Sequence, residues 1–233
     1  MTETRTTLRR GFSVAFVGPD GAGKTTVARR LETELPLPVT YLYMGVSAES
    51  SNRLLPTTRL IRSIRRRKGV VERGPKARTA ESVDRPSLRR RLRAAARLLN
   101  RVAEESYRQA IASREMRQGR IVLFDRHFFA DYHMHDIDTD GRLPLSRRLH
   151  GLFISRVLAR PDLLVFLDVP AEVLFARKGE GTIELLDEMR EGYRRLSSAG
   201  PSFVTLDGDR PLDDVVADAV AVVLAHAEAS NSR

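Results

Sequence analysis

The chain has 233 residues, of which 42% are hydrophobic, and this is enough for one sizeable domain around a well-covered core. It has no cysteine, which excludes disulfides and thiolate metal sites, and no apolar run of about 18 residues, so we expect a soluble cytoplasmic protein without an export signal. The formal net charge of +10 is concentrated in one segment, which argues against a uniformly basic DNA-binding domain.

The first predicted element is a buried strand over residues 12–17 that runs directly into a glycine-rich loop. Residues 18–25 read Gly-Pro-Asp-Gly-Ala-Gly-Lys-Thr and fit the pattern G-x-x-x-x-G-K-[ST]. In this pattern backbone N–H groups close around phosphate oxygens, the lysine supplies charge to the transferring phosphate, and the hydroxyl is a Mg²⁺ ligand. A helix predicted over residues 27–35 points its positive end at the same phosphates. The predicted nucleotide site comprises Gly18, Asp20, Gly21, Ala22, Gly23, Lys24, Thr25 and Thr26.

A second strand is predicted over residues 39–44, and segment 47–85 then interrupts the alternation of strands and helices. Its serines, glycines, prolines and arginines and its weak apolar pattern predict a mobile insertion with up to one amphipathic helix. Between Arg53 and Arg101 there are 17 Lys and Arg residues against three acidic ones, whereas the rest of the chain has 23 basic and 27 acidic residues. Residues 53–101 are therefore either a solvated insertion or a surface for a polyanion or an anionic membrane. We expect no stable nucleic-acid partner, because the segment has no aromatic side chain for base stacking.

A long helix is predicted over residues 86–118, followed by a third buried strand over residues 121–124. Asp125 and Arg126 come directly after it. Because the carboxyl ends of parallel strands meet at one edge of a sheet, we expect Asp125 to lie across from the phosphate loop and to hold Mg²⁺ or its waters. Arg126 would then clamp an anionic acceptor, with an ordinary Asp-Arg strand cap as the alternative. In the loop that follows, His127 and Tyr132 are expected to line the acceptor.

The alternation continues to the end of the chain. Helices are predicted over residues 145–159, 171–177, 182–197 and 211–227, and strands over 163–167 and 203–206. The five predicted strands are nearly continuous apolar runs, which is typical of strands buried on both faces of a parallel sheet. The sequence therefore predicts one α/β domain over residues 1–233, with three α/β/α layers, a five-stranded parallel sheet and a basic helical insertion.

These motifs together resemble the thymidylate kinase family of P-loop nucleoside monophosphate kinases over most of the chain except the basic insertion. The loop with aspartate at its third position, the Asp125-Arg126-His127 strand end and the segment 161–170 are similar to those of the family. So are residues 177–180, 189–196 and 206–210, where the family has its lid, the next helix and the segment lining the adenine. The resemblance implies a P-loop NTPase fold and an ATP- and Mg²⁺-dependent kinase. Such a kinase would transfer the γ-phosphate to a small acceptor, of which a nucleoside monophosphate is the leading class.

The resemblance also implies roles for individual residues. Asp20 would hydrogen-bond an acceptor hydroxyl, and Arg126 would neutralise an acceptor phosphate. Arg177, at the start of a lid over residues 177–183, would swing onto the phosphates as the lid closes. The expected set is Lys24, Arg126, Arg177 and Asp20 for catalysis, Arg177, Asp207 and Arg210 for ATP, and Thr25 and Asp125 for the metal.

Two segments of the family have no counterpart in this chain. The family's Arg-Glu-Pro-Gly-Gly-Thr is replaced by Met-Gly-Val-Ser-Ala-Glu at residues 44–49, and its Ala-Ala-Asp-Arg signature is missing from residues 98–105. Because these elements read the pyrimidine and its phosphate in the family, another nucleotide, a nucleoside, or a different hydroxyl or phosphate compound stays open as the acceptor instead. A sugar, a lipid-linked group and a nucleic-acid end also stay open as acceptors. Arg101 and Arg108 on the long helix are further acceptor candidates, against the alternative of a solvated helix face. A homodimer and a non-catalytic nucleotide-binding regulatory module are also left open.

Overall fold

The fold is built on a five-stranded parallel sheet. A computed structural model describes residues 8–44, 88–127, 151, 153, 156, 159–198 and 202–232. The strands are β1 (Ser13–Val17), β2 (Val39–Tyr43), β3 (Ile121–Asp125), β4 (Leu163–Asp168) and β5 (Ser202–Asp207). They lie in the order β2-β3-β1-β4-β5, and every neighbouring pair is parallel. The loops that follow all five strands therefore leave the sheet at the same edge.

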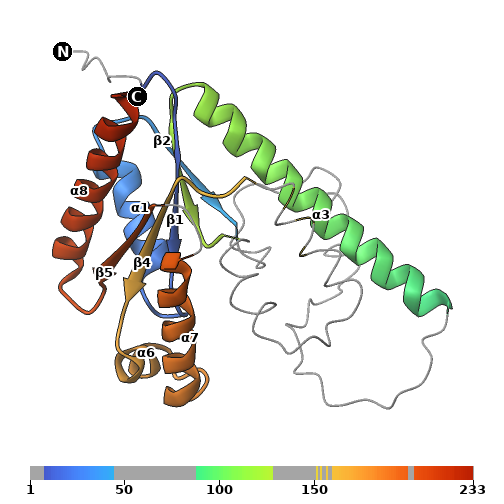
Figure 1. The fold of residues 1–233 in the computed structure, drawn as a ribbon. Coiled ribbons are helices and arrows are strands. Elements are labelled where there is room, and N and C mark those ends of the chain that lie inside the picture. Colours follow the sequence, from blue (N-terminus) through green and yellow to red (C-terminus); the bar gives the residue numbers. More distant parts are fainter. Residues whose placement is uncertain are drawn as a thin grey trace, which may run out of the picture.

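Helices cover both faces of this sheet. They are α1 (Lys24–Glu34), α3 (Leu88–Arg117), α6 (Ala171–Lys178), α7 (Ile183–Arg195), continued by the short 3₁₀ helix η1 (Leu196–Ser198), and α8 (Leu212–Asn231). Figure 1 shows α1 and α8 side by side on one side of the sheet and the long α3 on the other. The predicted three-layer α/β/α arrangement around a five-stranded parallel sheet is confirmed.

The buried side chains divide into two clusters, because successive residues of a strand point to opposite faces. On one face, Val14 and Phe16 of β1 pack with Leu31 of α1 and Val216 of α8. On the other face lie Ala15 and Val17 of β1, Phe124 of β3, Ala112 of α3 and Tyr193 of α7. Burying a side chain such as Leu31 or Phe124 contributes about 1.5–3 kcal/mol. The two clusters therefore hold the strand ends in fixed positions.

Glycines and caps set several helix ends. Gly119 ends α3 with φ 74°, and a Cβ there would lie 2.4 Å from the carbonyl oxygen of Leu8. Gly179 ends α6 with φ 64°, and the side chain of Thr182 accepts a hydrogen bond from the backbone N–H of Leu185 at the start of α7. The connection between α6 and α7 is therefore only four residues long, and both of its ends are fixed by local backbone chemistry.

The predicted strands all appear. The largest error in a described helix is at the end of α8, which runs to Asn231, four residues beyond the predicted end at residue 227. The next largest concerns α1. It begins at Lys24, three residues before the predicted start at Val27, because the glycine loop closes immediately before the lysine. Residues 151, 153 and 156 are helical, whereas most of the helix predicted over 145–159 lies outside the described residues. The same is true of the insertion predicted over 47–85 and of most of the basic segment 53–101. None of the described helices is both apolar and long enough to cross a membrane.

Candidate active site

The phosphate loop joins β1 to α1 through three glycines in the left-handed half of φ space. Gly18, Gly21 and Gly23 have φ of 145°, 95° and 87°, backbone conformations that residues other than glycine rarely adopt. Within this turn Ala22 is buried and its N–H donates to the carbonyl oxygen of Pro19 at 3.3 Å. No side chain caps the start of α1 and no acidic residue lies in its first turn. Its first N–H groups and its positive end are therefore suited to an anion such as a phosphate.

Lys24 is the buried cation of this loop. Its side chain is 6% exposed, and its Nζ donates to the carbonyl oxygens of Gly18 and Pro19 at 2.8 and 2.7 Å. The same Nζ lies 3.8 Å from Oδ1 of Asp20. The structure thus brings the lysine and the aspartate of the loop together, with the ammonium held against the loop backbone. Thr25 and Thr26 follow on the exposed first turn of α1.

Asp125 lies at the end of β3 and is completely buried. Its Oδ2 accepts hydrogen bonds from the hydroxyls of Thr25 at 2.6 Å and Tyr41 at 2.8 Å. Burial, together with the bond to Asp125, raises the pKa of Tyr41, so this phenol stays protonated and remains a donor. The sequence-based expectation that Asp125 lies across from the loop is met by its direct contact with Thr25.

The Asp125–Thr25 pair fits a Mg²⁺ ion. Among the residues that the structure describes, no donor reaches Oδ1 of Asp125, and a buried anionic oxygen without a partner is unfavourable. Thr25 donates its proton to Asp125, which leaves the lone pairs of its own oxygen for a cation. Within the described ranges there is no group of three His, Asp or Glu side chains that would form a protein cage for a metal. A hydroxyl and one carboxylate beside phosphates is the sparse donor set that Mg²⁺ commonly uses.

Asp20 and Arg126 form an ion pair that joins the phosphate loop to the end of β3. Arg126 has φ 67°, a conformation that costs a residue with a side chain about 1–3 kcal/mol, and its N–H donates to the carbonyl oxygen of Phe16 at 3.3 Å. Burial raises the pKa of Asp20, but the positive charges of Arg126 and Lys24 outweigh this and hold the pKa below its usual value. The pair therefore presents an ionised carboxylate and a guanidinium side by side at the edge of the sheet.

Arg177 reaches the phosphate loop from the last turn of α6. Its guanidinium lies 3.5 Å from the carbonyl oxygen of Gly21 and 3.4 Å from Oδ1 of Asp209, and the side chain is 40% exposed. The two other residues predicted beside the adenine make contacts within their own segment. Asp207 accepts the N–H of Asp209 at 3.0 Å, and Arg210 pairs with Asp214 and Asp218 of α8. The structure therefore brings Arg177 to the loop, while Asp207 and Arg210 shape the turn between β5 and α8.

The predicted acceptor contacts on α3 differ from one another. Arg108 is 6% exposed, so it does not lie on a solvated helix face, and it lies 3.9 Å from Glu104. Burial lowers the pKa of Arg108, against the opposing effect of Glu104 and Glu105. Arg101 is half-exposed and pairs with Glu105 at 3.0 Å. Contact of either arginine with an acceptor stays a prediction.

The loop after β3 is described only at its start. His127 is 2% exposed and its ring packs on Phe124 at a centroid distance of 4.9 Å. Burial lowers the pKa of His127 to about 3, so the imidazole is neutral at neutral pH. Tyr132 lies outside the described residues. A role of His127 toward the acceptor also stays a prediction.

Two features near the site were missed by sequence reasoning. One is Tyr41, which the apolar pattern of β2 assigns only to the core; its ring lies beneath the guanidinium of Arg29 at 3.7 Å. The other is Asp168 at the end of β4, which accepts from Arg190 and Arg194 of α7 at 2.9 and 2.7 Å. The strand-end rule applied to Asp125 would also have selected Asp168. No such sequence pattern indicates a role for Tyr41 outside the core.

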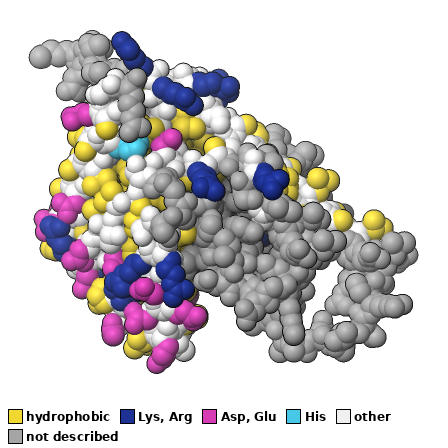
Figure 2. Space-filling model, in the orientation of Figure 1, with side chains coloured by type: hydrophobic (Ala, Val, Ile, Leu, Met, Phe, Trp, Pro, Cys, Tyr) yellow, Lys and Arg dark blue, Asp and Glu magenta, His cyan; other side chains and the backbone are white. Residues whose placement is uncertain are grey.

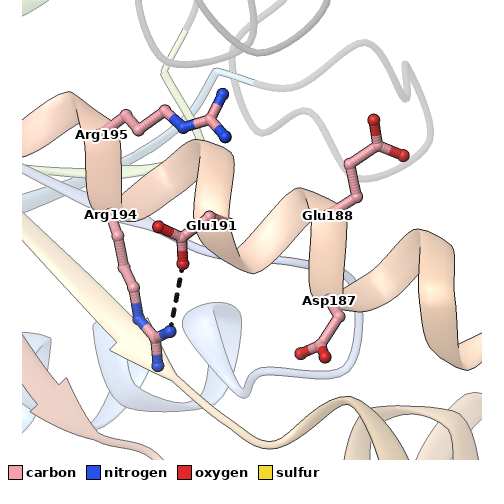
Figure 3. Close-up of a pocket in the computed structure, with 5 residues that line it drawn as sticks. All are labelled: Asp187, Glu188, Glu191, Arg194 and Arg195. Carbon is pink, nitrogen blue, oxygen red and sulfur yellow. Dashed lines mark hydrogen bonds and ion pairs between the residues drawn. The ribbon is translucent and has the colours of Figure 1, made fainter.

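A separate hollow of about 600 Å³ lies along α7 (Figure 3). Its described lining consists of charged residues of this helix alone: Asp187, Glu188, Glu191, Arg194 and Arg195. In Figure 3, Arg194 and Asp187 point to one side of the helix and Glu188 and Arg195 to the other. Figure 2 shows that basic and acidic side chains are intermixed over this end of the molecule. No residue of the phosphate loop is among the described lining, so this hollow is distinct from the phosphate loop around Lys24.

Comparison with known proteins gives relatives over nearly the whole chain, although no family model matches. The thymidylate kinase of Dinoroseobacter shibae is 31% identical over 230 residues, covering 91% of this chain and 95% of the relative. That of Geobacillus thermodenitrificans is 26% identical over 249 residues, covering 94% and 92%. Among solved structures, thymidylate kinase from Candida albicans has a TM-score of 0.60 at 18% identity, covering 96% of this chain and 94% of that one. Deoxyadenosine kinase from M. mycoides has a TM-score of 0.51 at 13% identity, covering 91% and 98%, and these two likenesses support the fold.

Proposed function

The chain belongs to the thymidylate kinase family, and from this premise we propose that it is a phosphotransferase that moves the γ-phosphate of ATP to a nucleoside monophosphate. The observation that carries the proposal is the Asp20–Arg126 ion pair beside Lys24, at the mouth of the phosphate loop. Its curated relatives are named thymidylate kinases, so thymidylate is the first acceptor to test. That the acceptor is a nucleoside monophosphate is itself proposed.

The phosphate loop and the start of α1 are suited to a nucleoside triphosphate. The uncapped first turn of α1 and the glycine loop offer N–H groups to phosphate oxygens, and Lys24 adds a full positive charge. A Mg²⁺ ion held by Thr25 and Asp125 would supply further positive charge to the phosphate oxygens. Phosphoryl transfer is accelerated mainly by such positioning and charge, so the chain needs no covalent intermediate.

The acceptor side is suited to a molecule that carries both an anionic phosphate and a hydroxyl. Arg126 has the planar donor geometry that binds a phosphate through two hydrogen bonds. An acceptor phosphate would replace Asp20 as the partner of the Arg126 guanidinium. The carboxylate of Asp20 is ionised because its pKa is lowered, and it would then accept a hydrogen bond from an acceptor hydroxyl. A nucleoside monophosphate has both groups, whereas a nucleoside has no phosphate to neutralise Arg126. Arg126 and Asp20 therefore favour nucleoside monophosphates over the neutral acceptors left open by the sequence.

Arg177 would complete the site from α6. Its present partners are a backbone carbonyl and a half-exposed carboxylate at 3.5 and 3.4 Å, both weak contacts that a phosphate would replace. In this role Arg177 stabilises the charge that spreads over the transferring group, and a lid over residues 177–183 excludes water until the acceptor is bound.

The proposal is tested with a panel of acceptors in the presence of ATP and Mg²⁺. The panel contains the common deoxynucleoside and nucleoside monophosphates, the matching nucleosides, and sugar phosphates, and ADP release is measured above the rate without acceptor. We expect acceptor-dependent ADP release with at least one nucleoside monophosphate and none with nucleosides. Arg126→Ala should raise the KM for that acceptor and leave ATP affinity unchanged. Release that never exceeds the acceptor-free rate across the panel would refute the proposal.

A further inference from the structure

We propose that Tyr41 is a positioning residue for the metal site: its hydroxyl fixes the carboxylate of Asp125 in the orientation in which Asp125 and Thr25 receive Mg²⁺. The inference rests on the proposed function, because it concerns the metal-bound nucleotide. Tyr41 itself is not a ligand in this account. It acts through the carboxylate that it holds.

Three elements converge on a single oxygen of Asp125. Tyr41 comes from β2, Thr25 from α1 and Asp125 from β3, and both hydroxyls donate to Oδ2. The register of the sheet explains why Tyr41 reaches this far. Tyr43 is the neighbour of Asp125 across the β2–β3 pair, so Tyr41 lies two residues earlier on the same face, about 6.6 Å along the strand. The length of a tyrosine side chain is needed to bridge that interval.

Two donors on one oxygen restrict the carboxylate. The last torsion of an aspartate is broad, so a carboxylate with one partner samples many orientations. Here Thr25 and Tyr41 approach Oδ2 from different elements, and this leaves Oδ1 without a donor among the residues that the structure describes. Groups that hydrogen-bond a ligating side chain typically affect metal affinity about 10–100-fold. The free oxygen is thus presented in a fixed direction.

Arg29 supports the same arrangement. Its guanidinium lies 3.7 Å from the centroid of the Tyr41 ring, and Arg29 is four residues after Thr25 on the same face of α1. A cation over the ring withdraws electron density, which makes the phenol a stronger donor. Helix α1 would therefore contribute one ligand of a bound Mg²⁺, Thr25, and it also holds the ring of Tyr41 that orients the carboxylate of Asp125.

Packing alone does not account for the hydroxyl. Tyr41 is 3% exposed and belongs to an apolar cluster with Phe16, Ile121 and Leu123, in which a phenylalanine would fill nearly the same space. Burying a hydroxyl is unfavourable unless it is hydrogen-bonded, and the bond to Asp125 satisfies it. The hydroxyl is thus explained by the carboxylate it contacts.

The test is Tyr41→Phe, read out as nucleotide binding rather than turnover. The affinity for a fluorescent ATP analogue is measured over a Mg²⁺ titration and again in EDTA. The matched control is Tyr193→Phe, which removes another buried tyrosine hydroxyl in the opposite core cluster, where the ring stacks on Phe166. Thermal unfolding of each variant checks that the fold is intact.

We expect Tyr41→Phe to raise the Mg²⁺ concentration for half-maximal binding about tenfold, with affinity in EDTA unchanged. Tyr193→Phe should match the wild type, and Tyr41→Phe should add nothing in an Asp125→Asn background. An unchanged Mg²⁺ titration, an equal loss of affinity in EDTA, or an additive effect in that background would each overturn the inference. Failure of the wild type itself to bind nucleotide in a Mg²⁺-dependent manner would instead overturn the proposed function.

Discussion

Replacing Arg177 by alanine should lower kcat far more than it lowers the free energy of unfolding. The side chain is 40% exposed, and its contacts to Gly21 and Asp209 at 3.5 and 3.4 Å are at the limit of hydrogen-bond distance. Contacts of this kind contribute about 0–1 kcal/mol to folding. An arginine that stabilises a transferring phosphoryl group is worth about 10³–10⁵ in rate, or roughly 4–7 kcal/mol. The catalytic effect should therefore exceed the stability effect several-fold.

The assay compares kcat, ATP affinity and the free energy of unfolding for Arg177→Ala and a matched control. Arg30→Ala removes an arginine that is equally exposed and pairs with Glu34 and Asp213, neither of which belongs to the phosphate loop. We expect kcat to fall at least about 10³-fold in Arg177→Ala with little change in ATP affinity, and to stay unchanged in Arg30→Ala. A loss of less than tenfold in Arg177→Ala, or similar losses in both variants, would refute the role given to Arg177.

Three further predictions concern stability and the loop. Asp168→Ala should lower the free energy of unfolding by about 2 kcal/mol in urea titrations, because it removes the charged partner of Arg190 and Arg194. Burial raises the pKa of Asp168, but its two arginines hold this pKa below the ordinary 3.8. The stability difference between the wild type and Asp168→Ala should therefore persist above pH 3.8 and vanish as the pH falls below it. A stability difference that disappears already at pH 6 would contradict the pairing. The pKa of His127 in the folded state is about 3, against an ordinary 6.5, because the ring is buried. The contribution of His127 to the free energy of unfolding should therefore be complete above pH 6.5 and should fall by about 2 kcal/mol by pH 5. His127→Phe should abolish that fall, and an unchanged pH profile in this variant would show that the imidazole is not buried. Gly18→Ala should lower the free energy of unfolding by about 1–3 kcal/mol and weaken nucleotide binding, because φ of Gly18 is 145° and a Cβ there would lie 2.9 Å from the carbonyl oxygen of Leu167. Nucleotide binding and stability equal to those of the wild type would exclude this backbone conformation.

Strands β1 to β4 were predictable because the parallel sheet buries nearly all of their positions on both faces. The expectation of burial on both faces was wrong for the edge strand β5, which is exposed or half-buried at every position except Leu206. Each strand is a short, nearly continuous apolar run, and the burial of β1 and β3 at every position agrees with this. The phosphate loop was predictable for a different reason. Its glycines, lysine and threonine have a fixed spacing that the backbone chemistry requires. Asp125 followed from the rule that parallel strands end at one edge of the sheet.

The side-chain pairings were not predictable from the sequence. Tyr41 reaches Asp125 only because β2 lies next to β3, and this neighbourhood depends on the strand order rather than on any local pattern. The pairing of Arg126 with Asp20 likewise needs the positive φ of Arg126, which is unusual for a residue other than glycine. Arg108 is a third example, because its burial against Glu104 depends on how α3 packs on the sheet. Spacing along the chain carries no information on the first two contacts. Glu104 and Arg108 are four residues apart on one helix, so their proximity was predictable and only their burial was not.

The most direct test of the account follows the phosphate itself. The protein is incubated with Mg²⁺, a nucleoside monophosphate identified by the acceptor panel and ATP labelled at the γ-phosphate, and the products are separated. We expect the label to appear in the nucleoside diphosphate, and Lys24→Met to abolish this transfer. Recovery of the label only as inorganic phosphate, or transfer that survives without the Lys24 ammonium, would contradict this expectation.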